Sequence, residues 1–344
     1  MPTRLAEEGL RFSSGPEDTG RSIEIVGRSS VMKSLFSELE SLGASDASVL
    51  IEGETGVGKN LVARAIHEQS PRSSGPFVAL SAANIPEPLF ESELFGHVKG
   101  AFSGALENHQ GLARAAEGGT LFLDEVGELS LANQAKLLFF LDSRAVRPVG
   151  GLRQTPVDFR LISATNRDLL DQVRQRAFRR DLFYRLRVIA LRVPSLRERR
   201  EDVPLLVSYF LDKLARKYGK PMPRISAGAM AKLEQYDWDG NVRELENEIE
   251  RAVVMTEANG VVQPQMLLSS VSGVAQPLFQ SSSLQESRLA AERSVILQAL
   301  KRQRWNVSAA ARELDISRVG LTRKLKRLGI RRPGYGSEGK TSAL

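Results

Sequence analysis

Residues 48–60 read SVLIEGETGVGKN, an apolar run followed by a glycine-rich loop and a lysine. The apolar run Ser48–Glu52 predicts a strand, and an amphipathic helix is expected over Asn60–His67. The loop between them has the glycine spacing and the final Lys59 of a phosphate-binding loop. Glycines let backbone N–H groups wrap a phosphate, and the start of the following helix adds partial positive charge. The sequence therefore predicts a nucleotide site, formed by Gly53, Glu54, Thr55, Gly56, Val57, Gly58, Lys59, Asn60 and Leu61.

A pair of acids follows a second apolar strand, Thr120–Leu123. In a nucleotide-hydrolysing site we expect Asp124 to hold Mg²⁺ and Glu125 to polarise the attacking water. Lys59 would reach the β- and γ-phosphates of ATP. Asn60 stands where such loops usually carry Ser or Thr, so the hydroxyl ligand to Mg²⁺ is missing.

Strands and helical stretches alternate from Ile23 to about Leu191, with further strands expected at Phe77–Leu80 and Phe159–Ala164 and a helix at Asn133–Leu141. This alternation predicts an α/β fold with a parallel sheet covered on both faces. Strand signals then fade, and apolar residues recur at helical spacing. A small helical subdomain is therefore expected, with helices over Val203–Lys217, Ala227–Gln235 and Val242–Met255.

The predicted organisation has six parts. They are a flexible lead (1–22), an α/β ATPase subdomain (23–195), a helical lid (196–256), a linker rich in Ser, Gln, Gly and Pro (257–285), a helical DNA-binding domain (286–330) and a disordered tail (331–344). The short lead has no room for a receiver or sensor domain, so activity is expected to be set by a partner protein, by expression level, or not at all.

Composition excludes several classes of protein. The 344 residues include no cysteine, and the three histidines make no metal-ligand spacing. No apolar run approaches a membrane span, and the first residues lack the apolar core of a secretory signal. A cytoplasmic protein is expected.

The positive charge is concentrated near the C-terminus. Residues 301–332 hold eleven Lys and Arg against two acids, so this block at +9 exceeds the whole chain's +7. The block is also rich in apolar residues, which favours a folded domain that binds a polyanion over a solvated tail.

The pattern of Trp305–Ile330 predicts a helix–turn–helix. Ser308 would cap a first helix reaching Leu314, Asp315–Ser317 would form the turn, and Arg318–Leu328 would be the second helix. The helix Arg288–Leu300 would supply a dimer contact, so the DNA site should be a palindrome. Contacts to the DNA bases and phosphates are expected from Ser308, Arg318, Thr322, Arg323, Lys324, Lys326 and Arg327.

Residues 91–105, ESELFGHVKGAFSGA, closely resemble the GAFTGA loop of bacterial enhancer-binding proteins, the AAA+ activators of sigma-54 RNA polymerase. The resemblance extends from Ile25 to Ile330 and includes LFLDEVGELS, ISATNRDL, FRRDLFYRL, SLRERREDVPLL and WDGNVRELEN. It implies an ATP-dependent transcription activator that works as a hexameric ring. The loop residues that would touch the sigma factor are Gly100, Ala101, Phe102, Ser103, Gly104 and Ala105. Glycines would allow a tight, mobile tip with Phe102 as an apolar anchor.

The resemblance also implies roles around the nucleotide. Thr165 and Asn166 would sense the γ-phosphate, and Arg243 would close the lid over the nucleotide. Arg179 and Arg185 would be arginine fingers that act on a neighbouring subunit, although an exposed basic helix is the rival interpretation. The adenine would be bordered by Ile25, Val26 and Gly27.

Several positions depart from the family pattern. Ser103 replaces the usual Thr, Val98 the usual Glu, and Asp239 the usual Pro. Ser81 replaces an Asn that restrains the catalytic glutamate, so basal ATP hydrolysis is expected to be leaky. Two other functions remain open: an AAA+ motor acting on DNA itself, against which the GAFSGA segment argues, and a nucleotide-binding repressor, against which the catalytic acids argue.

Overall fold

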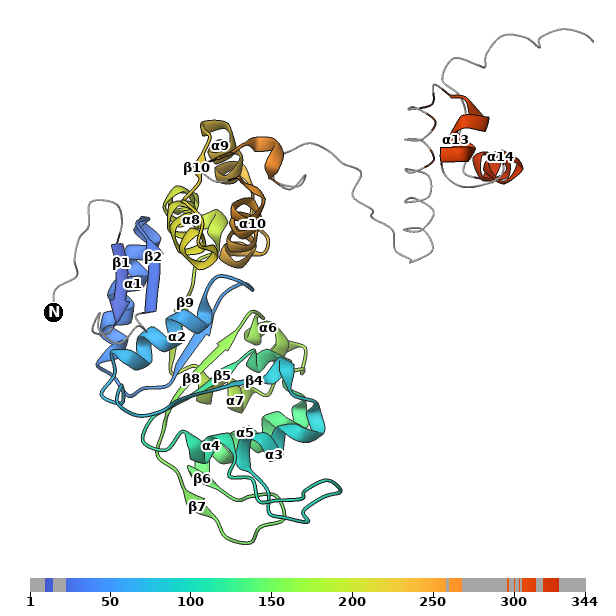
Figure 1. Cartoon of the computed structure of the whole chain (residues 1–344). Coiled ribbons are helices and arrows are strands. Elements are labelled where there is room, and N and C mark those ends of the chain that lie inside the picture. The colour runs from blue at the N-terminus through green and yellow to red at the C-terminus, as the bar shows by residue number, and fades with distance from the viewer. Residues whose placement is uncertain are drawn as a thin grey trace, which may run out of the picture. The chain divides into compact units, whose positions relative to one another are not determined.

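The computed structural model describes residues 10–14, 23–257, 260–267, 296, 300, 303, 305–313 and 318–327. They belong to two compact units, one within residues 1–273 and one within residues 274–344 (Figure 1). Across these ranges, no helix is long and apolar enough to cross a membrane.

A five-stranded parallel sheet forms the centre of the first unit. Its order is β4–β5–β8–β3–β9, with bounds Phe77–Ser81, Thr120–Asp124, Arg160–Thr165, Val49–Glu52 and Ile189–Arg192. The predicted strands and the α/β class are confirmed, and β9 is an additional edge strand. Because all five strands are parallel, their carboxyl ends share one edge, where the loops after β3, β5 and β8 meet.

Side chains along β3, β4, β5 and β8 alternate between two apolar clusters. In β5, for example, Leu121 and Leu123 pack in one cluster and Phe122 in the other. The Phe122 side carries α1 (Ser30–Gly43) and α2 (Lys59–Glu68). The opposite side carries α3 (Phe90–Phe95), α4 (Leu112–Ala115), α5 (Leu131–Ser143), α6 (Leu169–Arg174) and α7 (Arg180–Leu186). The sheet is therefore buried on both faces, as its apolar strands require.

Part of the predicted flexible lead is a strand. β1 (Leu10–Ser14) pairs antiparallel with β2 (Ile23–Gly27), which corrects the expectation for residues 10–14. This pairing satisfies backbone groups of β2 that the central sheet does not reach. A second small ribbon, β6 (Ala145–Val146) with β7 (Thr155–Pro156), lies at another edge of the α/β part.

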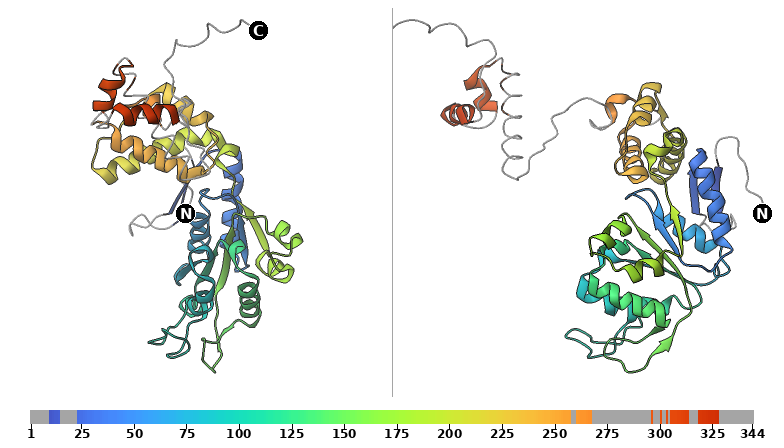
Figure 2. Two further views of the ribbon diagram at one scale, coloured as in Figure 1. Left: turned by 90° about the vertical axis from the view of Figure 1, so that its right-hand side faces the viewer. Right: turned by 180° about the vertical axis from the view of Figure 1, so that it is seen from behind.

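The lid is a bundle of three helices, drawn yellow to orange in Figures 1 and 2: α8 (Val203–Tyr218), α9 (Ala227–Gln235) and α10 (Asn241–Met255). It extends beyond residue 256, where the sequence predicted a linker. β11 (Val261–Val262) pairs with β10 (Arg224–Ile225), and Val262 and Leu267 are buried in the lid core. These apolar side chains lie too sparsely among polar residues to give a helical signal.

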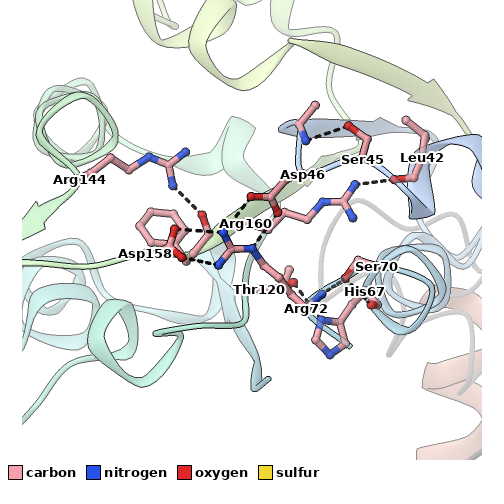
Figure 3. Close-up of polar contacts among 12 residues, drawn as sticks. Leu42, Ser45, Asp46, His67, Ser70, Arg72, Thr120, Arg144, Asp158 and Arg160 are labelled. Atoms are coloured by element: carbon pink, nitrogen blue, oxygen red, sulfur yellow. Dashed lines mark hydrogen bonds and ion pairs between the residues drawn. The ribbon is translucent and has the colours of Figure 1, made fainter. Parts of the chain in front are cut away.

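A polar cluster lies at the amino-terminal ends of the strands, opposite the nucleotide loop. Figure 3 shows Arg72 between two carboxylates, with paired hydrogen bonds to Asp46 (2.8 Å each) and Asp158 (2.9 and 3.0 Å). Beside them, fully buried Arg160 donates from Nη2 to the Leu42 carbonyl at 2.9 Å. Its Nε and Nη1 have no partner among the described residues, and burial lowers the pKa of this guanidinium.

The second unit contains α13 (Val307–Glu313) and α14 (Arg318–Arg327), packed around buried Ala311 and Leu321. The first helix begins one residue before the predicted cap Ser308. Asn306 caps it instead, since its Oδ1 accepts from the N–H groups of Ser308 and Ala309 at 3.1 Å each. The predicted turn at 315–317 and most of the expected helix 288–300 lie outside the described residues.

Candidate functional site

The phosphate-binding loop connects β3 to α2. Gly56 (φ +82°) and Gly58 (φ +104°) take left-handed conformations that favour glycine, and Gly58 is the N-cap of α2. Buried Lys59 lies back along the loop, with Nζ donating to the carbonyls of Gly53 (3.0 Å) and Glu54 (3.2 Å). The loop thus holds its lysine in place at the N-terminus of a helix, an arrangement suited to an anionic ligand.

The two predicted acids meet this lysine. Glu125 follows β5 with φ +55°, and its Oε1 lies 3.6 Å from Lys59 Nζ. Its Oε2 accepts from the Asn166 N–H at 3.3 Å, while Asp124 Oδ1 accepts from the Glu125 N–H at 3.0 Å. Residues far apart in sequence therefore converge on one point at the carboxyl edge of the sheet.

Of the predicted γ-phosphate sensors, Asn166 faces the loop. Its Nδ2 donates to Thr55 Oγ1 at 3.0 Å. Thr165 is fully buried, and its hydroxyl accepts from the Arg167 N–H at 3.1 Å. Asn166 is therefore the member of the pair that connects the loop with Glu125.

Ser81 lies opposite Asp124 in the register of β4 and β5. Within the described part of the chain its hydroxyl makes no hydrogen bond to Glu125, whose carboxylate contacts Lys59 and Asn166 instead. That Ser81 holds Glu125 less firmly than the family's Asn stays a prediction.

The donor set fits Mg²⁺ held mainly by its substrate. Among the described residues there is no group of three or more His, Cys, Asp or Glu side chains able to cage a metal. Asp124 offers one carboxylate at the loop, and the exposed Asn60 offers an amide oxygen in place of a hydroxyl. Mg²⁺ commonly takes one or two carboxylates plus substrate phosphates and waters, which suits this arrangement.

A pocket of about 800 Å³ adjoins the loop. Ile25 and Val26 line it as predicted, with Leu61 among the loop residues on its wall. Gly27 is not among the lining residues and packs on Met32, whose Cγ would lie 2.8 Å from an added Cβ. Besides the predicted Arg243, the lid and the segment leading into it contribute lining residues that the sequence did not indicate: Arg199, Leu206, Tyr209, Phe210 and Lys213. Their helical spacing resembles that of any core-facing helix, so sequence pattern gave no signal for them.

The lid binds the phosphate loop directly. The Arg243 N–H donates to the Gly56 carbonyl at 3.2 Å, and the Arg243 side chain lines the pocket, where the sequence placed it. Glu54 accepts from Asn241 Nδ2 at 3.1 Å and from both terminal nitrogens of Arg197. The hydrogen bonds from Arg197 and then Asn241 lower the pKa of Glu54. Glu54 is therefore a charged contact between loop and lid at neutral pH.

The two expected arginine fingers lie outside this pocket. Arg179 precedes α7 and pairs with Asp181 through Nε (3.0 Å) and Nη2 (2.7 Å), which raises the pKa of Arg179. Arg185 is held by Asp142 (3.3 Å) and by the Leu141 carbonyl (2.8 Å). Neither arginine lines the nucleotide pocket of its own chain.

The GAFSGA segment forms a tight, projecting loop. Gly100 (φ +81°) and Gly104 (φ +109°) have open space where a Cβ would lie, and the Gly100 N–H donates to the Ala105 carbonyl at 2.9 Å. Phe102 is 38% exposed, and its ring centroid lies 5.0 Å from that of His97. The predicted apolar tip is thus accessible while one side packs on its own stem.

A second loop, residues 147–154 between β6 and β7, lies beside this one and gave no signal in the sequence. The Val98 N–H donates to the Val149 carbonyl at 3.1 Å, and Ala101 lies within contact distance of Gly150. Leu152 of this loop is 97% exposed. Both loops project from the end of the α/β part that carries β6 and β7 (Figures 1 and 2).

The helix–turn–helix presents several predicted DNA contacts. Arg318 and Thr322 are exposed on α14, and Lys324 is half-buried. Ser308 is half-buried near the start of α13. The side chains of Arg323, Lys326 and Arg327 lie outside what the structure describes.

Comparison with known families accounts for most of the chain. Residues 25–192 match the sigma-54 interaction domain, residues 197–284 the AAA+ ATPase lid domain, and residues 289–328 the bacterial regulatory protein family of Fis type.

Named relatives match most of the chain in sequence or in structure. The response regulator PilR of Pseudomonas aeruginosa is 46% identical over 310 residues, which cover 89% of this chain and 70% of PilR. The transcriptional regulatory protein ZraR of Escherichia coli K12 is 46% identical over 312 residues, covering 91% and 70%. Solved structures of Brucella abortus NtrX with ADP and with ATP are 36% and 35% identical, with TM-scores of 0.72 and 0.71. They cover 91% and 92% of this chain and 70% of NtrX.

Proposed function

Because the chain belongs to the family of sigma-54-dependent transcriptional regulators, we propose that it couples ATP hydrolysis to remodelling of sigma-54 RNA polymerase, from closed to open promoter complexes. The observation that carries this proposal is the convergence of Lys59, Asp124 and Glu125 at one edge of the central sheet, in a chain that also projects the GAFSGA loop. One chain thus combines a hydrolytic site with an exposed apolar tip.

The site residues have distinct roles in this proposal. Lys59 would leave the loop carbonyls and bind the β- and γ-phosphates of ATP, as the backbone N–H groups of the loop wrap them. Glu125, freed from Lys59, would orient a water in line with the γ-phosphate. Mg²⁺, held by Asp124 and the phosphates, would offset the phosphate charge. Asn166 would report the γ-phosphate, because it already connects Thr55 with Glu125.

The arginine fingers require a neighbouring subunit. Arg179 and Arg185 do not line their own pocket, and each is held by a carboxylate on the surface of its own chain. A homo-oligomeric ring, with six subunits as in the family, would let an arginine leave its acid for the more strongly charged phosphate next door. The charge on the transferring phosphoryl group would then be stabilised only in the assembled ring.

The GAFSGA loop and the loop between β6 and β7 would move during the ATP cycle and push on the sigma factor. Phe102 supplies an accessible aromatic anchor, and the open surroundings of Gly100 and Gly104 leave room for the tip to change conformation. α14 would lie in the major groove of upstream DNA, with a dimer reading a palindrome. In this proposal the protein acts in the cytoplasm, and a regulatory protein acting in trans would set its activity.

The test is ATP-dependent open-complex formation by sigma-54 polymerase with the parent chain, Phe102→Ala and Leu106→Ala. Leu106 is a matched control, since it is 79% exposed and lies just beyond the loop. We expect Phe102→Ala to abolish activation while retaining ATP hydrolysis, and Leu106→Ala to activate normally. Activation that survives in Phe102→Ala would refute the proposed contact.

A motor that acts on DNA alone would need no sigma-54 polymerase for its effect. Strand separation by the purified chain without polymerase would therefore favour that second function.

A further inference from the structure

Asn241 lies at the junction of three segments. It is the first residue of α10, fully buried, with φ +55°. Its Nδ2 donates to Glu54 Oε2 and to the Thr55 carbonyl, both at 3.1 Å, while its Oδ1 accepts from the Leu196 N–H at 2.8 Å. One side chain thus connects the phosphate loop, the lid helix and the segment that leads into the lid.

The lid and Lys59 together bind consecutive carbonyls of the loop. Lys59 Nζ binds those of Gly53 and Glu54, Asn241 that of Thr55, and the Arg243 N–H that of Gly56. The peptide bonds of the described chain are all trans. In a trans peptide the C=O and the following N–H point in opposite directions. Because the carbonyls of Thr55 and Gly56 are bound by the lid, the N–H groups of Gly56 and Val57 point away from the lid.

We propose that Asn241 is a positioning residue that orients the Thr55 peptide, so that loop N–H groups form a ready-made nest for the phosphates. This inference rests on the proposed ATPase function. Asn241 does not line the nucleotide pocket, so it acts through the loop rather than on the ligand.

The contact is too close to be incidental. An added Cβ on Gly56 would lie 2.2 Å from the Gly240 carbonyl oxygen, so the loop and the lid touch through backbone. The left-handed φ of Asn241 is a conformation that few residues other than Gly, Asn and Asp adopt readily. Because binding energies are reciprocal, a loop that binds phosphate better when docked must also hold the lid more firmly when phosphate is bound.

The experiment compares ADP binding by calorimetry and steady-state ATP hydrolysis in the full chain. Asn241→Asp keeps the backbone conformation and the Oδ1 acceptor for Leu196, but loses the donor. Asn241→Gly also suits φ +55° and adds no charge beside Glu54, but it removes both the donor and the acceptor for the Leu196 N–H. Arg197→Gln is the control, since it removes a partner of the same Glu54 carboxylate and leaves the Thr55 carbonyl bound.

We expect both Asn241 variants to bind ADP about tenfold or more weakly, because both lose the buried hydrogen bonds from Nδ2 to the Thr55 carbonyl and to Glu54. KM for ATP should rise while kcat changes little, because the nest binds ground and transition states alike. Arg197→Gln should stay close to the parent. ADP affinity equal to the parent in either folded variant would overturn the inference. A parent chain that hydrolyses no ATP would instead overturn the proposed function.

Discussion

Substituting Gly56 by alanine tests how closely the phosphate loop contacts the lid. The new Cβ would lie 2.2 Å from the Gly240 carbonyl oxygen and 3.2 Å from the Arg243 Cβ. Neither neighbour is the flexible end of a side chain, so the loop and α10 must move apart. The substitution also places a non-glycine residue at φ +82°.

Two costs add in this variant. The left-handed conformation costs roughly 1–2 kcal/mol for a residue with a Cβ. Relief of the overlap adds about 1–3 kcal/mol, the range for overpacked sites. Gly58→Ala is the matched control, because Gly58 has φ +104° but nothing within 4 Å of its added Cβ. It should pay the conformational cost alone.

Thermal unfolding of the ligand-free chain measures the difference. For a unit of this size, about 1 kcal/mol lowers Tm by roughly 2–4 °C. We therefore expect Gly58→Ala to melt about 2–8 °C below the parent and Gly56→Ala a further 2–12 °C lower. Equal melting temperatures for the two variants would show that the Gly240 carbonyl does not pack against Gly56 as closely as described.

Three further predictions concern other contacts. Arg197 lowers the pKa of Glu54 below its ordinary 4.5. The Arg197–Glu54 ion pair therefore stabilises the folded chain fully above pH 4.5, and this stabilisation is lost as the pH falls through the lowered pKa. The Tm difference between the parent and Arg197→Gln should therefore be present at pH 7 and shrink in strong acid, and a constant difference would contradict this. Ser81→Asn should lower basal ATP hydrolysis severalfold by restraining Glu125, whereas an unchanged rate would dismiss the idea. Arg160→Met should leave the free energy of unfolding unchanged or higher by about 1 kcal/mol or more, because two buried nitrogens lack partners. A loss of about 2 kcal/mol in urea unfolding would refute that reasoning.

Local pattern was sufficient for the α/β core. The apolar runs before Gly53 and Asp124 predicted β3 and β5, and their parallel pairing with β8 brought the loop, the acids and Asn166 together. Parallel strands place their carboxyl ends on one edge, so motifs at strand ends converge whatever their separation in sequence. The strand β11 was missed because two residues show no periodicity, and β1 was missed because its two apolar side chains stand among polar ones.

The residue types were enough to indicate the chemistry, because the phosphate loop, the two acids and the glycine-framed apolar tip are local motifs. Which residues surround these motifs depended on the tertiary structure. It placed Asn241 against Thr55, brought the lid's apolar face to the nucleotide pocket, and set Gly150 beside Ala101 of the GAFSGA loop. These are contacts between segments far apart in the chain, and they depend on how helices pack. Amphipathic spacing shows that a helix face is buried, but not which partner covers it.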